Sequence, residues 1–83
     1  MYYTYILFSA KINRFYTGQT EDLNRRIEEH NRGKTSGMAK GIPWKLMYSK
    51  EFSSRNEAIK LEMIFKKRGA ARFLIDSQIS PDG

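Results

Sequence analysis

The stretch from Tyr2 to Phe8 constrains the fold more than any other part of this chain. It is a run of mainly aromatic and β-branched residues, which predicts a buried strand. Phe15 to Gly18 predicts a second short strand, and the polar connection from Ser9 to Arg14 favours a hairpin between the two.

A helix is predicted directly after this hairpin. Thr20 is a suitable N-cap for a helix from about Glu21, and Gly33 is a suitable stop. The segment from Lys34 to Gly41 has two glycines and no periodicity, so we expect a mobile basic loop.

The second half of the chain predicts one strand and two helices. Pro43 to Phe52 alternates like a strand, with Trp44, Leu46 and Tyr48 expected on one face and Lys45, Met47 and Ser49 on the other. Ser54-Arg55-Asn56-Glu57 is a capping box, and Gly69 follows the basic end of the helix that it opens. The residues of this helix expected to face the core are Ala58, Leu61, Ile64 and Phe65. Ala70 to Ile75 predicts a short third helix.

The predicted order is therefore β-β-α-β-α-(α), a small α+β domain with a three-stranded, largely antiparallel sheet. We expect one domain over residues 1–76 and a flexible tail over 77–83. The chain has no cysteine and no apolar run near the 18 or so residues that a membrane span needs. A cytoplasmic protein is the expectation, since the absence of cysteine fits a reducing compartment.

The charge of the chain points to a polyanionic partner. Fifteen Lys and Arg residues against nine Asp and Glu give a net charge of +6 over 83 residues. Nucleic acid is the partner that such a balance favours most, although a soluble protein that is merely basic has the same composition.

Two tyrosines and a glycine on the predicted hairpin are the first candidate site residues. If Tyr5 and Tyr16 oppose each other, both hydroxyls reach one patch, where a phenol can position or deprotonate water. Gly18 would let a phosphate approach the backbone. The alternative for each tyrosine is simple packing in the sheet, and for the glycine the end of a strand.

Arg26 and His30 are four residues apart on the predicted first helix, next to its apolar edge. We expect them at the rim between core and solvent. An arginine there can clamp a phosphate, and a histidine can act as an acid or base near neutral pH. The alternative is a solvated helix face on which Arg25, Glu28, Glu29 and Arg32 provide ion-pair partners.

Glu62 is a candidate metal ligand on the second helix, at the edge of its apolar stripe. A carboxylate at such a rim can hold Mg²⁺, which prefers oxygen ligands and keeps several waters. The alternative is an ion pair with Lys66, which the spacing also allows.

Taken together, these positions resemble the GIY-YIG nuclease family. Tyr3-Thr4-Tyr5 is similar to the first motif and Tyr16-Thr17-Gly18 to the second, and the stretch through Asn31 resembles the strand-to-helix segment that follows. Arg26 and His30 match the catalytic arginine and the frequent histidine, and Glu62 matches the metal ligand of the later helix. The resemblance covers residues 2–74 and is closest to small stand-alone bacterial members.

The resemblance implies a metal-dependent endonuclease that hydrolyses DNA, with a role in DNA repair or processing. It implies that Tyr5, with Tyr16 close by, activates water, that Arg26 and His30 hold the phosphate, and that Glu62 holds Mg²⁺ or Mn²⁺. The chain departs from the family at two places: the first motif lacks Gly and Ile, and no Asn follows Asn56.

Three functions follow from these residues: a DNA nuclease, a nucleic-acid-binding module with the same fold but little or no turnover, and a protein-binding adaptor. The sequence identifies no protein partner. RNA is a further possible substrate. The first two functions would use a basic patch formed by Arg25, Arg32, Lys34, Lys40, Lys66, Lys67, Arg68 and Arg72.

Overall fold

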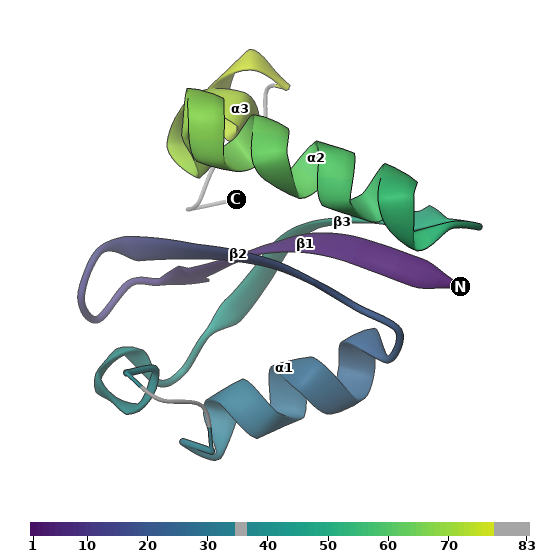
Figure 1. Ribbon diagram of the computed structural model, residues 1–83. Coiled ribbons are helices and arrows are strands. Elements are labelled where there is room, and N and C mark those ends of the chain that lie inside the picture. Colours follow the sequence, from purple (N-terminus) through teal and green to yellow (C-terminus); the bar gives the residue numbers. More distant parts are fainter. Residues whose placement is uncertain (35–36, 78–83) are drawn as a thin grey trace.

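Three antiparallel strands form the middle layer of the molecule (Figure 1). The computed structural model describes residues 1–34 and 37–77. In chain order the elements are β1 (Tyr2–Ser9), β2 (Arg14–Thr20), α1 (Leu23–Asn31), a short 3₁₀ turn η1 (Ala39–Gly41), β3 (Lys45–Phe52), α2 (Arg55–Arg68) and α3 (Ala70–Asp76). This order confirms the predicted α+β fold and each of its six predicted elements.

The sheet has the order β2-β1-β3, so the apolar first strand is its central strand. The helices cover opposite faces: α1 lies against one, and α2 and α3 lie against the other (Figure 1). Neighbouring residues of β1 therefore enter different cores. Tyr5 and Leu7 belong to the core under α1, whereas Ile6 belongs to the core under α2 and α3. No helix among the described residues is both long and apolar enough to cross a bilayer.

A β-bulge in β3 overturns the predicted alternation of that strand. Ile6 pairs with Tyr48 but Leu7 pairs with Leu46, so Met47 is an extra residue in the register. Trp44 packs in the α1 core, whereas Tyr48 packs against the α2 and α3 core. The prediction that Trp44 and Tyr48 share a face was wrong, because one inserted residue reverses every side chain beyond it.

Helix α1 begins two residues later than predicted. Asp22 is the N-cap, and its carboxylate accepts a hydrogen bond of 3.2 Å from the backbone N–H of Arg25. The hydroxyl of Thr20 instead accepts from the N–H of Asp22 at 3.2 Å, which shapes the turn before the helix. Gly33 ends the helical segment as predicted, with a φ of 74°.

Helix α2 begins and ends where the sequence predicts. The Ser54 hydroxyl accepts from the N–H of Glu57 at 3.3 Å, and Gly69 follows the helix with a φ of 91°. Ala58 and Phe65 are buried, and Leu61 packs against the cluster that contains Phe65. Ile64 does not face the core, because it is 44% exposed on the outer side of the helix.

The segment before β3 is more ordered than the predicted mobile loop. Met38 is buried, and its carbonyl oxygen accepts a hydrogen bond of 2.8 Å from the indole N–H of Trp44. Residues 35–36, and residues 78–83 of the predicted tail, lie outside the described residues. Ser77 is described, and its N–H donates to the carbonyl of Phe73 at 3.0 Å.

Candidate active site

Tyr5 is the centre of a buried polar cluster on the α1 face. Its side chain is 1% exposed, and its hydroxyl lies 3.1 Å from Nε2 of His30. The ring reaches across Gly18, its partner on β2: a Cβ at Gly18 would lie 2.7 Å from the Tyr5 hydroxyl oxygen. Gly18 thus makes room for the phenol, a role different from the predicted approach of a phosphate to the backbone.

Tyr16 lies beside Tyr5 but not opposite it. Tyr16 pairs with Leu7 in the register, so the two tyrosines are diagonal neighbours with ring centroids 6.3 Å apart. They share a face because Tyr5 and Leu7 are two residues apart on β1. The Tyr16 ring also meets His30 edge-on at 4.9 Å, so the two tyrosines and the histidine form one aromatic cluster.

His30 is a core residue, which corrects its predicted place at the rim. It is fully buried, and its Nδ1 is a buried side-chain atom without a hydrogen-bond partner among residues 1–34 and 37–77. Burial lowers its pKa, and the positive charge of Arg26 lowers it further, so the ring is neutral near pH 7. His30 is buried because it lies on the side of α1 that faces the sheet, where it contacts both Tyr5 and Tyr16.

The tautomer of His30 follows from this environment. An orphaned buried N–H is rarer in proteins than an under-satisfied acceptor. That preference favours the proton on Nε2, from which it is donated to the Tyr5 oxygen, and leaves Nδ1 as the unpaired acceptor. The hydrogen of the Tyr5 hydroxyl is then free for another acceptor, such as water or a phosphate oxygen.

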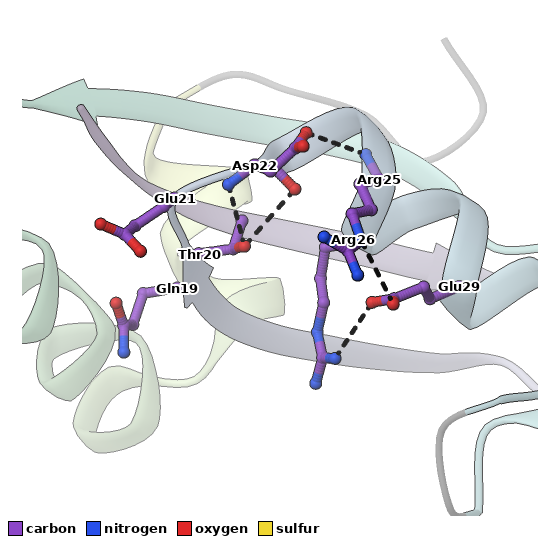
Figure 2. Close-up of a pocket in the computed structure, with 7 residues that line it drawn as sticks. All are labelled: Gln19, Thr20, Glu21, Asp22, Arg25, Arg26 and Glu29. Atoms are coloured by element: carbon purple, nitrogen blue, oxygen red, sulfur yellow. Dashed lines mark hydrogen bonds and ion pairs between the residues drawn. The ribbon is translucent and has the colours of Figure 1, made fainter.

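Arg26 lies one helical turn before His30, at the boundary that the sequence predicted for both. Its side chain is 38% exposed, and its NH1 lies 3.4 Å from Oε1 of Glu29. Glu29 also faces Arg25, whose Nε is 3.6 Å from Oε2. Figure 2 shows both arginines and Glu29 at an open depression of about 340 Å³. The other residues that line it are Gln19, Thr20, Glu21 and Asp22.

The acid–base state of Tyr5 depends on burial and on Arg26. Burial raises the pKa of Tyr5 to about 12, and the neighbouring Arg26 guanidinium opposes this rise. The negative charge of the Glu62 carboxylate and the neighbouring Tyr16 phenol also contribute to this raised value. Tyr5 is therefore a neutral phenol near pH 7, and a further positive charge at its hydroxyl would favour the phenolate.

Glu62 stands on α2 with its side chain 18% exposed. Its Oε2 lies 3.6 Å from Nζ of Lys66, so the ion pair named as the alternative is present. Among the residues that the structure describes, no group of three or more His, Asp or Glu side chains is placed to hold a metal. Glu62 is the carboxylate that the sequence assigns to a metal, and a single carboxylate fits an Mg²⁺ ion that keeps most of its waters and takes further oxygens from a phosphate.

Comparison with known proteins agrees with this arrangement. Residues 1–73 match the family model of the GIY-YIG catalytic domain. The chain belongs to the GIY-YIG family. A UPF0213 protein of Streptococcus agalactiae is 39% identical over 67 residues, which cover 80% of this chain and 75% of the relative. A UPF0213 protein of Limosilactobacillus reuteri is 38% identical over 81 residues, covering 90% of this chain and 83% of the relative.

A solved structure supports the same assignment. The solution NMR structure of a UPF0213 protein from Bacillus halodurans is 34% identical, with a TM-score of 0.57, and the match covers 98% of this chain and 89% of that one. The resemblance to small stand-alone GIY-YIG proteins is thereby confirmed. Membership in the GIY-YIG family implies a nuclease-type function and suggests a nucleic acid as the substrate.

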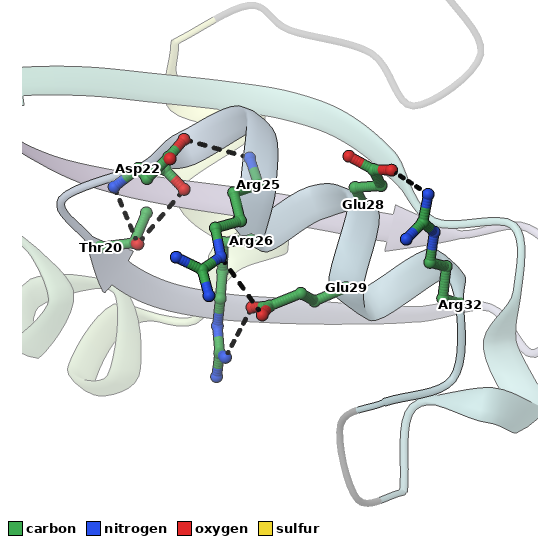
Figure 3. Close-up of polar contacts among 7 residues, drawn as sticks. All are labelled: Thr20, Asp22, Arg25, Arg26, Glu28, Glu29 and Arg32. Atoms are coloured by element: carbon green, nitrogen blue, oxygen red, sulfur yellow. Dashed lines mark hydrogen bonds and ion pairs between the residues drawn. The ribbon is translucent and has the colours of Figure 1, made fainter.

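The basic residues of this GIY-YIG domain do not form a single patch. Arg25 lies on α1 and Arg32 directly after it, whereas Lys66, Lys67, Arg68 and Arg72 lie on α2 and α3, across the sheet (Figure 1). Many of them also face acids, as Figure 3 shows for α1. The pairs are Arg25–Glu29, Arg32–Glu28, Lys66–Glu62, Arg68–Asp76 and Arg72–Asp76. Lys34 is exposed just after the C-terminal end of α1, and Lys40 is exposed in η1.

Sequence reasoning did not assign three of the residues that contribute to the site. Gln19 and Thr20 line the depression beside Arg26, and the sequence marked Thr20 only as a helix cap. Asn31 follows His30, and its side chain accepts a hydrogen bond of 2.6 Å from the Trp44 N–H and donates one of 3.1 Å to the Trp44 carbonyl. This pair of bonds holds the end of α1, and with it His30, against the segment before β3. The only sequence signal for this role of Asn31 is its position next to His30.

Proposed function

We propose that this protein is a divalent-metal-dependent endonuclease that hydrolyses DNA phosphodiester bonds. The observation that carries the proposal is the contact of 3.1 Å between the Tyr5 hydroxyl and Nε2 of His30, with Tyr16 against the same imidazole and Arg26 one turn away. A polar cluster buried beside an arginine that lines an open depression suits the handling of a phosphate better than it suits simple packing.

Arg26 is proposed to bind the scissile phosphate. Its guanidinium reaches the depression while its backbone belongs to the helix that holds His30, so the cation is presented from a rigid element. A phosphate entering there competes with Glu29 for NH1 of Arg26. Arginine stabilises the charge that develops on the phosphoryl oxygens during attack.

Tyr5 is proposed to orient the attacking water, with Tyr16 and His30 holding the ring in place. Its raised pKa of about 12 means that it holds its proton in the free protein. It can therefore donate a hydrogen bond to water or phosphate at neutral pH, and it acts as a base only once its pKa is lowered. Arg26 is the residue of this chain that lowers it.

Glu62 is proposed to hold one Mg²⁺ or Mn²⁺ ion. The bound ion supplies Lewis-acid stabilisation of the phosphate and of the leaving oxygen. Glu62 would have to exchange its contact with Lys66 for the ion, and its side chain is much less exposed than that of Lys66, at 18% against 67%.

A second function, a nucleic-acid-binding module with little or no turnover, is favoured by the surroundings of Glu62 and by the sequence after it. Glu62 is already paired with Lys66, and the described part of the chain places no second and third metal-binding side chains beside it. The chain also has no Asn after Asn56, where many family nucleases carry one.

Nicking of supercoiled plasmid DNA tests the proposal. We expect Mg²⁺- or Mn²⁺-dependent nicking that Glu62→Ala abolishes while DNA binding persists, and Arg26→Ala should lower the rate by about 10²–10³-fold. Glu57→Ala, which removes an exposed acid from the same helix, is the matched control and should nick like the wild type.

Three results would contradict the proposed nuclease function, each in a different way. A clean preparation that cleaves no duplex, flap or single-stranded DNA supports the binding module instead. Nicking that survives Glu62→Ala refutes the metal assignment or exposes a contaminating nuclease. Both nucleic-acid functions predict that DNA binding weakens by about 0.9 log units of affinity per log unit of salt for each neutralised phosphate, whereas a salt-independent complex with a protein would refute both and favour a protein-binding adaptor.

A further inference from the structure

Thr4 is a buried polar residue that the proposed reaction does not use. It is fully buried in β1, and its hydroxyl donates a hydrogen bond of 2.7 Å to the backbone carbonyl of Ala58 in α2. Its side chain is on the opposite face of the sheet from Tyr5, with the apolar cluster of Ile6, Phe65 and Leu74. Thr4 occupies the Ile position of the first family motif, so an apolar side chain is compatible with this place in the fold.

The acceptor of this hydrogen bond is a specific carbonyl. In an α-helix the carbonyl of residue 58 accepts the N–H of residue 62, because the bond joins each N–H to the carbonyl four residues earlier. Thr4 therefore binds the same oxygen that anchors the backbone of Glu62. Ala58 is itself fully buried and small, which lets α2 approach the sheet at this turn.

One short segment of β1 thus contacts both the histidine of the proposed site and the helix that carries Glu62. Tyr5 projects toward His30 and across Gly18 of the edge strand β2. Thr4, the residue before it, ties α2 to the sheet at the helical turn that leads to Glu62. A slide of α2 along the sheet would move the carboxylate relative to the Tyr5 hydroxyl, and the Thr4 hydrogen bond opposes such a slide.

We propose that Thr4 is a positioning residue that sets the place of Glu62 relative to Tyr5, and hence the affinity of the metal site. This inference rests on the proposed metal-dependent nuclease function. If the role of Thr4 were merely structural, its hydrogen bond would stabilise the fold without changing the metal affinity.

Thr4→Val and Thr4→Ser separate these two roles. Valine keeps the shape and removes the hydroxyl, whereas serine keeps the hydroxyl and removes a methyl group. The readouts are the Mn²⁺ concentration that half-broadens the NMR amide signal of Glu62, and the Mg²⁺ concentration that gives half-maximal nicking. By analogy with residues that orient metal ligands, Thr4→Val should raise both concentrations about 10-fold, and Thr4→Ser should stay within about twofold of the wild type.

Ser9→Ala is the matched control. Ser9 is another fully buried hydroxyl residue of β1, and it accepts a hydrogen bond of 3.3 Å from the N–H of Ile12 in the hairpin. It lies five residues from Thr4, or about 17 Å along the strand. Its loss should leave the metal dependence unchanged, and metal-free DNA binding should be equal in all variants.

The results that would refute the role of Thr4 differ from those that would refute the metal site itself. Wild-type metal dependence in Thr4→Val, with nicking intact, refutes the positioning role alone. An equal shift in Ser9→Ala shows that lost stability is the cause, which also refutes it. A wild type in which Mn²⁺ leaves the Glu62 signal unchanged refutes the metal site and the inference with it. If Thr4→Val does not fold, Thr4→Ile, which places the residue of the family motif there, takes its place.

Discussion

The two faces of the three-stranded sheet bury different kinds of side chain. The face under α2 and α3 is apolar and aromatic: Phe65 and Phe73 meet at 4.7 Å between ring centroids, and Tyr48 meets Phe73 at 5.1 Å, both edge-on. The face under α1 buries a histidine and a tyrosine hydroxyl, and it leaves Nδ1 of His30 without a partner among the described residues.

This difference indicates that one face of the sheet mainly stabilises the fold and that the other carries the reactive groups. Edge-on aromatic pairs add to burial, and the buried Thr4 hydroxyl on this face has a hydrogen-bond partner, so the α2 and α3 face should supply most of the stability. A buried nitrogen without a partner costs free energy, and such costs are concentrated where a protein needs reactive groups. We therefore expect substitutions on the two faces to affect different measurements.

Phe65→Ala, on the α2 and α3 face, should have the largest effect on stability. Phe65 is 1% exposed and contacts both Tyr48 and Phe73, so its truncation leaves a cavity and should lower the free energy of unfolding by about 3–5 kcal/mol. Urea denaturation measures the change. Ile64→Ala, one residue earlier but 44% exposed, is the control and should cost about 0.5 kcal/mol or less. A loss below about 1.5 kcal/mol for Phe65→Ala would show that the apolar face is not the main source of stability.

Gly18→Ala should disturb the polar side. The added Cβ would lie 2.7 Å from the Tyr5 hydroxyl oxygen, so the ring must move away from His30. We expect a cost of about 1–3 kcal/mol, loss of the Tyr5–His30 contact in NMR spectra and slower nicking.

Gly37→Ala is the control for Gly18→Ala. Gly37 has a φ of 78°, and among residues 1–34 and 37–77, apart from its chain neighbours, no atom lies within 4 Å of the added Cβ, so it tests backbone strain. That variant should keep the Tyr5–His30 contact. A Gly18→Ala protein that also keeps the contact at its wild-type distance would contradict the role assigned to Gly18.

The buried histidine predicts how stability depends on pH. Burial lowers the pKa of His30 in the folded state, so the unfolded chain binds the proton more readily. The stability that depends on neutral His30 is complete above the unfolded pKa, about 6.5, and is lost as the pH falls toward the folded pKa. The slope from this one proton cannot exceed about 1.4 kcal/mol per pH unit.

Urea denaturation at pH 7.5 and 5.5, together with NMR titration of the single imidazole, measures this effect. His30→Gln should remove the histidine part of the pH dependence. An imidazole that titrates at or above the ordinary value in the folded protein would show that the α1 face is more open to water than its burial indicates.

Glu28→Gln should have the smallest effect, because it touches neither face of the sheet. Glu28 pairs with Arg32 on the outside of α1, where the two side chains are 57% and 61% exposed (Figure 3). Solvent screens such a pair, so the loss should be about 0.3–0.5 kcal/mol, with unchanged nicking, in thermal unfolding and plasmid assays. A tenfold change in nicking would mean that the outer side of α1 belongs to the site.

Much of this fold was predictable from the sequence because its signals are local. The apolar run of β1, the Ser54 cap and the glycines after α1 and α2 act within a few residues, and the structure confirms each of them. The candidate site was predictable as a set because Tyr5, Tyr16, Arg26 and His30 come from elements joined by short turns. The start of α1 was mispredicted because Thr20 and Asp22 are both good caps, and the backbone of the turn selects between them.

The sequence by itself therefore determined the order of elements, the family and the residue types of the site. Tertiary structure decided that Trp44 and Tyr48 lie on opposite faces, that His30 is buried, and that the basic residues are divided by the sheet. The physical reason is that these features depend on contacts between distant residues. The Met47 bulge is defined only by pairing with β1, and the burial of His30 only by the two tyrosines that enclose it.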